Sequence, residues 1–223
     1  VGSSSGHMTK ARDDRRMPKR IYEARVPALR EALIQLQVSL KAAPFPVLLV
    51  IAGDNASGKG EVVNTLNGWL DPRGVETFAF HDPTDEERER PPMWRYWRSL
   101  PPRGRMAVYV GGWHADALAA HSKGARATAQ FEERLQHFAH FEGLLAADGA
   151  LIVKVWLQLS KRAQRERLQA LEEDADTAWR VTPEAQVSSI RLSDSLRETQ
   201  LPQDAASHSR DSFSSGACDF VCS

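Results

Sequence analysis

The chain has 223 residues, of which 42% are hydrophobic and 26% are charged, and its 29 basic and 29 acidic side chains cancel. These values are typical of one globular domain with a hydrophobic core, and a net charge of zero gives no general attraction to nucleic acid or to an anionic membrane. The longest apolar run, residues 45–52, is far shorter than the roughly 20 residues that cross a bilayer, so we expect no transmembrane segment.

The two ends of the chain differ from its body in composition. Residues 1–8 (VGSSSGHM) resemble an expression-tag remnant rather than a signal peptide, and the mostly charged residues 9–20 predict a flexible arm. Both cysteines, Cys218 and Cys222, lie in the last six residues, which leaves the body without a disulfide framework and favours a cytoplasmic setting. We expect one domain over residues 21–185 and a polar, disordered tail over residues 186–223.

The first predicted elements are a helix, a buried strand and a second helix. Apolar residues recur at helical spacing from Val26 to Leu40, with Pro27 placed in the first turn of the predicted helix. Residues 46–52 are rich in Val, Leu and Ile without alternation, which is typical of a strand buried on both faces of a parallel sheet. Residues 59–70 predict a helix that ends at the turn residues 71–74.

The same alternation continues along the chain. Residues 75–80, 106–110 and 151–157 predict three further strands. Between them we expect a short aromatic helix through Trp94 and Trp97 and a long helix over residues 131–145. A last helix over residues 161–173 follows, with Ser160 as its N-cap. Strands that alternate with helices predict an α/β fold built from parallel βαβ units.

The segment between the first strand and its helix carries a phosphate-binding motif. Residues 53–60 read GDNASGKG and match the G-x-x-x-x-G-K core of a Walker A loop. The amides of such a loop and the start of the following helix bind an anion, and Lys59 would reach the terminal phosphates. Gly60 stands where Ser or Thr would bind magnesium, so a metal needs other ligands. The predicted phosphate-binding residues of the loop are Gly53, Asp54, Asn55, Ala56, Ser57, Gly58, Lys59 and Gly60.

Two clusters of basic residues provide further candidate phosphate contacts. One cluster is Arg95, Arg98, Arg103 and Arg105, and the other is Lys161, Arg162, Arg165 and Arg167. Positions 161 and 165 share one face of the predicted helix, and the planar fork of arginine suits phosphate oxygens. The alternative is a solvated helix with pairs such as Arg162–Glu166.

Several strings, together with the loop, resemble the polyphosphate kinase type 2 family. They are LDPRG at 70–74, PT at 83–84, WR at 94–95, LP at 100–101, Gly104, Trp113, FE at 141–142, KVWL at 154–157, Ser160 and Trp179. The resemblance runs from about Tyr22 to Glu184, and nothing after residue 185 matches the family pattern. It is greatest to the first of the two fused domains of polyphosphate:AMP phosphotransferases, in which the second domain is the active one.

The resemblance implies a P-loop NTPase fold of the thymidylate-kinase type, with three layers and a mostly parallel central sheet. It implies inorganic polyphosphate and AMP or ADP as substrates, and magnesium if the chain is active. A second catalytic domain or a homo-oligomer would be its partner, with no role for nucleic acid or membrane. Phosphate contacts are also implied for Arg73 and, in a lid after the fourth strand, for Lys161, Arg162 and Arg165.

Two acids that active members of the family carry are absent from this chain. Asn55 replaces an Asp of the loop, and Val110 replaces the Asp that ends the third strand. The family's Asp-Arg-Ser-Trp-Tyr-Asn-Arg is replaced by VGGWHAD at residues 110–116, so both of its arginines are also missing. A positioned base contributes roughly 10²–10⁴ in rate, and an arginine clamp about 10³ or more.

These losses predict a domain that binds phosphate or supports an active partner with little turnover of its own. One alternative is an active phosphotransferase whose metal ligands are Asp54 or Asp116. Another is an ATP-dependent kinase of a small molecule on the same fold. His114 is expected to be a spectator in each case.

Overall fold

The computed structural model describes residues 17–53, 56–80, 82–114, 128–178 and 181. Its four strands are β1 (Val47–Gly53), β2 (Val75–Ala79), β3 (Met106–Val110) and β4 (Leu151–Leu157). The helices are α1 (Lys19–Leu40), α2 (Lys59–Trp69), η1 (Pro72–Gly74), α3 (Asp85–Arg88), α4 (Trp94–Arg98), α6 (Thr128–Ala147) and α7 (Lys161–Glu173). The strands lie where the apolar runs of the sequence predict them, to within one residue at each end.

The four strands form one sheet in the order β2-β3-β1-β4, and every neighbouring pair is parallel. This confirms the predicted α/β fold with a parallel sheet. Because the strands run the same way, the loops that follow β1, β3 and β4 leave the sheet at one edge, which we call the carboxyl edge. The turns that precede the strands lie at the opposite, amino edge.

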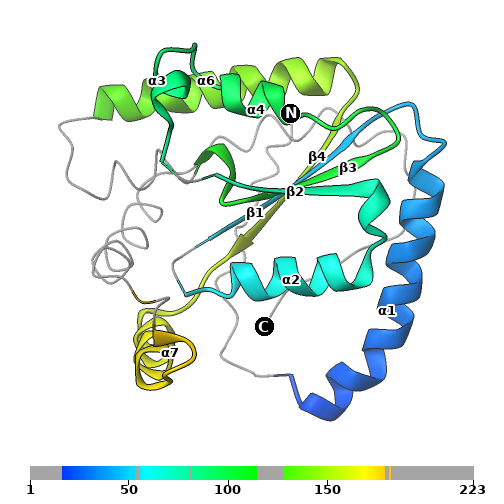
Figure 1. Cartoon of the computed structure of the whole chain (residues 1–223), viewed down its shortest axis with the longest axis vertical. Coiled ribbons are helices and arrows are strands. Elements are labelled where there is room, and N and C mark those ends of the chain that lie inside the picture. The colour runs from blue at the N-terminus through cyan, green and yellow to red at the C-terminus, as the bar shows by residue number, and fades with distance from the viewer. Residues whose placement is uncertain (1–16, 54–55, 81, 115–127, 179–180, 182–223) are drawn as a thin grey trace, which may run out of the picture.

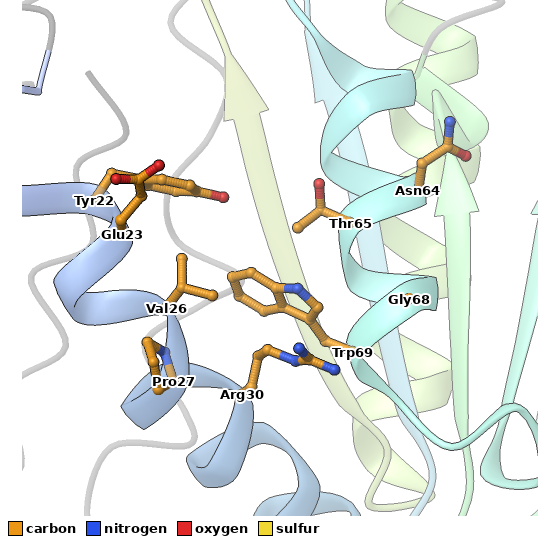
Figure 2. Close-up of a pocket in the computed structure, with 9 residues that line it drawn as sticks. All are labelled: Tyr22, Glu23, Val26, Pro27, Arg30, Asn64, Thr65, Gly68 and Trp69. Carbon is orange, nitrogen blue, oxygen red and sulfur yellow. The ribbon is translucent and has the colours of Figure 1, made fainter. Parts of the chain in front are cut away.

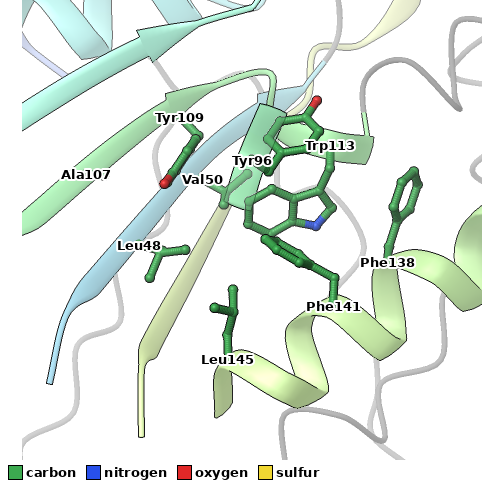
Figure 3. Close-up of a cluster of buried hydrophobic side chains, with 9 residues drawn as sticks. All are labelled: Leu48, Val50, Tyr96, Ala107, Tyr109, Trp113, Phe138, Phe141 and Leu145. Carbon is green, nitrogen blue, oxygen red and sulfur yellow. The ribbon is translucent and has the colours of Figure 1, made fainter. Parts of the chain in front are cut away.

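Helices cover both faces of the sheet and give the molecule three layers (Figure 1). Alternate strand residues point to opposite faces, so β1 supplies Leu48 and Val50 to one face and Val47 and Ile51 to the other. The first face packs against α4 and α6 through the aromatic-rich cluster in Figure 3, which includes the buried Trp113. The second face packs against α1 and α2. Two apolar cores therefore hold the sheet between two helical layers.

The first helix is longer than the sequence predicts. It begins at Lys19, inside the segment that we expected to be a flexible arm, and Pro27 lies within it rather than in its first turn. The early turns are charged and exposed, so they leave no apolar pattern to recognise, although Lys19 and Glu23 form an i, i+4 pair at 3.7 Å. An interior proline removes one backbone hydrogen bond, a loss that an exposed helix tolerates because water can solvate the freed carbonyl.

The short helix α3 was not predicted. It is held by a capping box, in which the Thr84 hydroxyl accepts from the Glu87 amide at 3.2 Å and the Thr84 amide donates to the Glu87 carboxylate at 2.9 Å. This motif stands after β2 and leads the chain into α4.

β4 is an edge strand in the described part of the sheet, because it pairs with β1 alone. Two apolar residues of this strand are exposed: Leu151 is 42% exposed and Val153 is 38% exposed. Lys154 follows Val153 and points to the opposite face of the sheet. Its ammonium donates a hydrogen bond to Glu142 of α6 at 2.8 Å.

Candidate phosphate-binding site

The loop after β1 starts at a position that only glycine can occupy. Gly53 has a φ of 144°, and a Cβ built on it would lie 2.0 Å from the carbonyl oxygen of Leu157 in β4. Ala56 and Gly58 also have positive φ, of 60° and 94°, so the described part of the loop curls sharply before α2 begins. Such a curl turns backbone N–H groups toward one point, as an anion site requires. Asp54 and Asn55 lie outside the described residues.

Lys59, the first residue of α2, belongs to this loop as the motif predicts. Its Nζ donates a hydrogen bond to the carbonyl oxygen of Gly53 at 2.8 Å, so the ammonium lies back across the loop. The hydroxyl oxygen of Ser57 is buried and has no hydrogen-bond partner in the described part of the chain. A helix N-terminus, an ammonium and an unsatisfied buried hydroxyl therefore meet at the carboxyl edge of β1, where an anion can bind all three.

The arginine that reaches this loop is Arg167 of α7, which the sequence analysis placed in a basic cluster but not in the site. Its Nη2 lies 3.5 Å from Oε1 of Glu61 in the first turn of α2. The guanidinium nitrogens also lie 3.5 and 3.7 Å from the point where a Cβ on Gly58 would stand. Arg167 therefore adds a positive charge beside the loop.

The other basic residues of α7 are arranged differently. Arg162 is 86% exposed and forms the predicted i, i+4 pair with Glu166 at 2.7 Å, and Arg165 is also exposed. The hydrogen bonds and ion pairs given between described residues do not join either side chain to the loop, and the Lys161 side chain lies outside the described residues. Gln164, at 3% exposure, lies on the inward side of α7 with Arg167. The helical period of the apolar residues that follow Ser160 could have identified this side.

The carboxyl end of β3 comes next to the loop. Val110 pairs with Ile51, and the amide of Gly111 donates to the carbonyl oxygen of Ile51 at 2.8 Å. Gly111 and Gly112 have φ of 80° and 60°, and a Cβ on Gly112 would lie 2.5 Å from Cγ1 of Val50. Val110 thus lies at the carboxyl end of β3 beside β1, with an apolar side chain.

A buried polar network follows this strand end. The Trp113 indole donates to Oε1 of Glu142 at 2.9 Å, and Lys154 donates to Oε2 at 2.8 Å. His114 Nε2 lies 3.6 Å from the same carboxylate, yet burial lowers the pKa of His114 to about 4 against the opposing effect of Glu142. The histidine is therefore uncharged at neutral pH. The network fixes the chain after β3 to α6. Its members, Trp113, His114, Glu142 and Lys154, are not residues of the phosphate loop.

Arg73 lies at the wrong edge of the sheet to join the loop. It precedes β2, whose first residue pairs with Met106 at the start of β3, so it stands at the amino edge. Its guanidinium is bound to Asp71, with the shortest distance at 2.7 Å, and this hydrogen bond lowers the pKa of Asp71 to about 2. The structure thus separates Arg73 from Lys59 by the length of the sheet.

The basic patch before β3 also divides between the two edges. Arg105 donates to the carbonyl of Arg73 at 2.8 Å, and Arg103 lies 3.5 Å from Asp148, both at the amino edge. Arg95 instead lies near the carboxyl end of β2. Its side chain is 11% exposed, pairs with Glu87 at 3.1 Å and stacks over Phe80 at 4.7 Å. Arg95 is therefore the member of this patch on the same edge as the loop.

The described residues do not supply a set of oxygen ligands suited to magnesium. Gly60 has no hydroxyl, Val110 has no carboxylate, and Glu61 faces Arg167. Within the described ranges no three His, Cys, Asp or Glu side chains come together in a metal-binding group. The two acids named as candidates, Asp54 and Asp116, lie outside those ranges. In the same part of the chain, no helix has the length and apolar character needed to span a membrane.

Comparison with known proteins identifies relatives of this domain. A curated polyphosphate:AMP phosphotransferase from Pseudomonas aeruginosa is 45% identical over 166 residues, and one from Pseudomonas syringae is 40% identical over 163 residues. These matches cover 74% and 73% of this chain but 34% and 33% of the two relatives, so the chain spans about a third of their length.

A solved structure supports the same relationship. The crystal structure of polyphosphate kinase 2 from Arthrobacter aurescens is 29% identical, with a TM-score of 0.76 over 87% of this chain and 71% of that one. The family model for polyphosphate kinase 2 matches residues 16–197, which extends into the segment that we assigned to the tail. Because the loop, the parallel sheet and these matches agree, the chain belongs to the polyphosphate kinase 2 family.

Proposed function

We propose that this chain is a polyphosphate kinase 2 domain that binds inorganic polyphosphate but transfers phosphoryl groups slowly or not at all. In this proposal it supports a second, catalytic domain or another copy of itself. The observation that carries the proposal is the carboxyl end of β3. Val110 stands beside Ile51 next to the loop, at the position where the resemblance implies an acid, and Gly111 follows where it implies an arginine.

Binding of phosphate is supported by groups that remain at the loop. Lys59 keeps its ammonium over Gly53, Ser57 presents a buried hydroxyl, and Arg167 adds a guanidinium that lies 3.5 Å from Glu61. Hydrogen bonds with a charged donor are stronger than those between neutral groups, and the planar guanidinium of arginine fits the oxygens of a phosphate chain. We therefore expect this domain to bind polyphosphate even if it transfers no phosphoryl group.

An active phosphotransferase is the second candidate, and the relatives named polyphosphate:AMP phosphotransferase favour it. The terminal phosphoryl group of polyphosphate would pass to a phosphate oxygen of AMP, which yields ADP and a chain one phosphate shorter. Magnesium would then be required, with Asp54 or Asp116 as its candidate ligands. The proposal and this alternative differ in one measurable quantity, the rate of ADP formation.

The binding part is tested with polyphosphate and matched variants. Lys59→Met should weaken binding about 10- to 150-fold, because a charge-assisted hydrogen bond contributes about 1.5–3 kcal/mol. Arg167→Ala should weaken it about 5-fold or more, whereas Arg162→Ala on the outer side of the same helix should change it less than about 2-fold. Equal effects of the two arginine variants in titration calorimetry would show that Arg167 does not contact the ligand.

The catalytic part is tested by following ADP formation from AMP and polyphosphate with magnesium. The chain alone should show a rate near background. The variant Asn55→Asp/Val110→Asp/Gly111→Arg should raise it, although the arginine must adopt a φ of 80°, at a cost of about 1–2 kcal/mol in stability. A rate of about 1–100 per second for the unmodified chain would refute catalytic degeneracy and support the alternative.

A further inference from the structure

An open cleft of about 540 Å³ lies between α1 and α2 (Figure 2). Its volume falls within the roughly 300–1,000 Å³ of pockets that hold small molecules. Two of the α2 residues that line it, Thr65 and Trp69, follow Lys59 by six and ten positions. At a rise of 1.5 Å per residue they lie about 9 and 15 Å along the helix axis from Lys59. The cleft is therefore a separate place from the candidate phosphate-binding site.

Two aromatic side chains line this cleft from different helices. Tyr22 belongs to α1 and is 47% exposed, and Trp69 is the last residue of α2. In Figure 2 the two rings lie on two sides of an open space, with Thr65 beside it. Rings of the apolar core, such as Tyr96 and Trp113, contact each other with centroids 5.6 Å apart, whereas among the described residues Tyr22 and Trp69 have no ring contact. Their faces are therefore open to stack on a flat heterocyclic ring.

A glycine beside Trp69 keeps the cleft open. Gly68 lies in the last turn of α2 and lines the cleft, and a Cβ built on it would meet nothing within 4 Å. Gly68 does not have a positive φ, so its backbone does not require glycine either. Glycine is less favourable than alanine in a helix, and neither packing nor backbone conformation explains it here. The missing side chain leaves room for a group that enters from outside.

The polar groups of the cleft suit an anion that is joined to such a ring. Arg30 of α1 lines the cleft and forms no ion pair among the described residues. The acid of the cleft, Glu23, lies 3.7 Å from Lys19. The Thr65 hydroxyl donates to the carbonyl oxygen of Glu61 at 2.7 Å, which leaves its oxygen able to accept a hydrogen bond. A guanidinium for a phosphate and a hydroxyl for a ring amino group thus border the two aromatic faces.

We propose that this cleft binds a nucleoside monophosphate, with the base against Tyr22 and Trp69 and the phosphate beside Arg30. Stacking depends little on which base is bound, so several nucleotides should bind. A phosphate chain without a base lacks the stacking and should not occupy the cleft. The site goes beyond the proposed function, because it needs neither Lys59 nor the phosphate loop.

The test is titration calorimetry with AMP on variants that fill or strip the cleft. Gly68→Leu has room for its side chain in the free protein and fills the cleft, so it should remove one bound AMP per chain. Gly143→Leu is the matched control, because a Cβ there also meets nothing within 4 Å but the residue lies on α6. It should leave AMP binding unchanged. Trp69→Ala should weaken binding to the cleft about 5- to 150-fold, and Arg30→Ala should weaken it about 5-fold.

The location is checked with the indole N–H signal of Trp69 in NMR spectra, identified by its absence in Trp69→Phe. AMP should shift this signal, in Lys59→Met as in the unmodified chain, and tripolyphosphate should not. Polyphosphate should bind Gly68→Leu as it binds the unmodified chain, which shows that the variant is folded; a chain that binds AMP but no polyphosphate would refute the proposed function alone. An indole signal that AMP leaves in place, the same number of bound AMP in Gly68→Leu, or an equal loss in Gly143→Leu would each overturn the nucleotide site.

Discussion

The network around Glu142 should contribute more to stability than its exposed neighbours on the same helix. In Glu142→Ala the buried indole N–H of Trp113 loses its acceptor, which costs about 1–3 kcal/mol. Removal of the one buried methylene group, Cγ, adds about 0.8 kcal/mol. Lys154 adds little, because its side chain is 47% exposed and water can replace the carboxylate. We expect a loss of about 3 kcal/mol in the free energy of unfolding.

Urea unfolding followed by tryptophan fluorescence measures this change, and thermal unfolding should show a fall of about 6–12 °C for a domain of this size. Glu133→Ala is the matched control, because it makes the same substitution at an exposed position of α6 and should change stability by less than about 0.5 kcal/mol. If both variants unfold at the same urea concentration, Glu142 does not hold the strand end as described.

Three other substitutions test contacts that hold the sheet and the helices around the site together. Gly53→Ala should prevent stable folding, visible as lost circular dichroism, because its Cβ would lie 2.0 Å from the Leu157 carbonyl oxygen. Gln37→Leu should cost about 2 kcal/mol in urea unfolding, because the amide exchanges two hydrogen bonds, at 2.7 and 2.8 Å, with the backbone of Asp71; an unchanged midpoint would contradict this. Burial raises the pKa of Tyr109 to about 12, so the folded state keeps a proton that the unfolded chain releases near pH 10. Stability should fall as the pH rises from about 10 to about 12, and this fall should be smaller in Tyr109→Phe; equal slopes would refute it.

Much of the fold could be predicted because the strands carry their own signal. β3 and β4 begin and end at the predicted residues, since a strand buried in a parallel sheet needs an uninterrupted apolar run. The start of α1 could not be predicted, because exposed charged turns show no periodicity. The helix α3 was missed although its Thr84-x-x-Glu87 capping box can be read from the sequence.

The candidate site was only partly predictable, because a motif locates neighbours in sequence and not in space. The loop and Lys59 follow from the motif, and Val110 lies beside them because parallel strands end at one edge. Arg73 was assigned to the site from a shared string, but a residue that precedes a strand must lie at the opposite edge. Arg167 was not assigned to the site, because the basic residues of α7 were judged by composition; the helical period of the apolar residues after Ser160 would have shown which side of α7 faces inward.

The open side of β4 has a practical consequence for anyone who handles this domain. In the described part of the sheet, the outer backbone groups of β4 beside Leu151 and Val153 have no partner strand and can accept a strand from another molecule, and such growth does not close on itself. Lys154 lies on the opposite face of the same strand, and a lysine on an edge strand discourages strand addition. Substituting Lys154 by an apolar residue should therefore turn a clear solution turbid on storage.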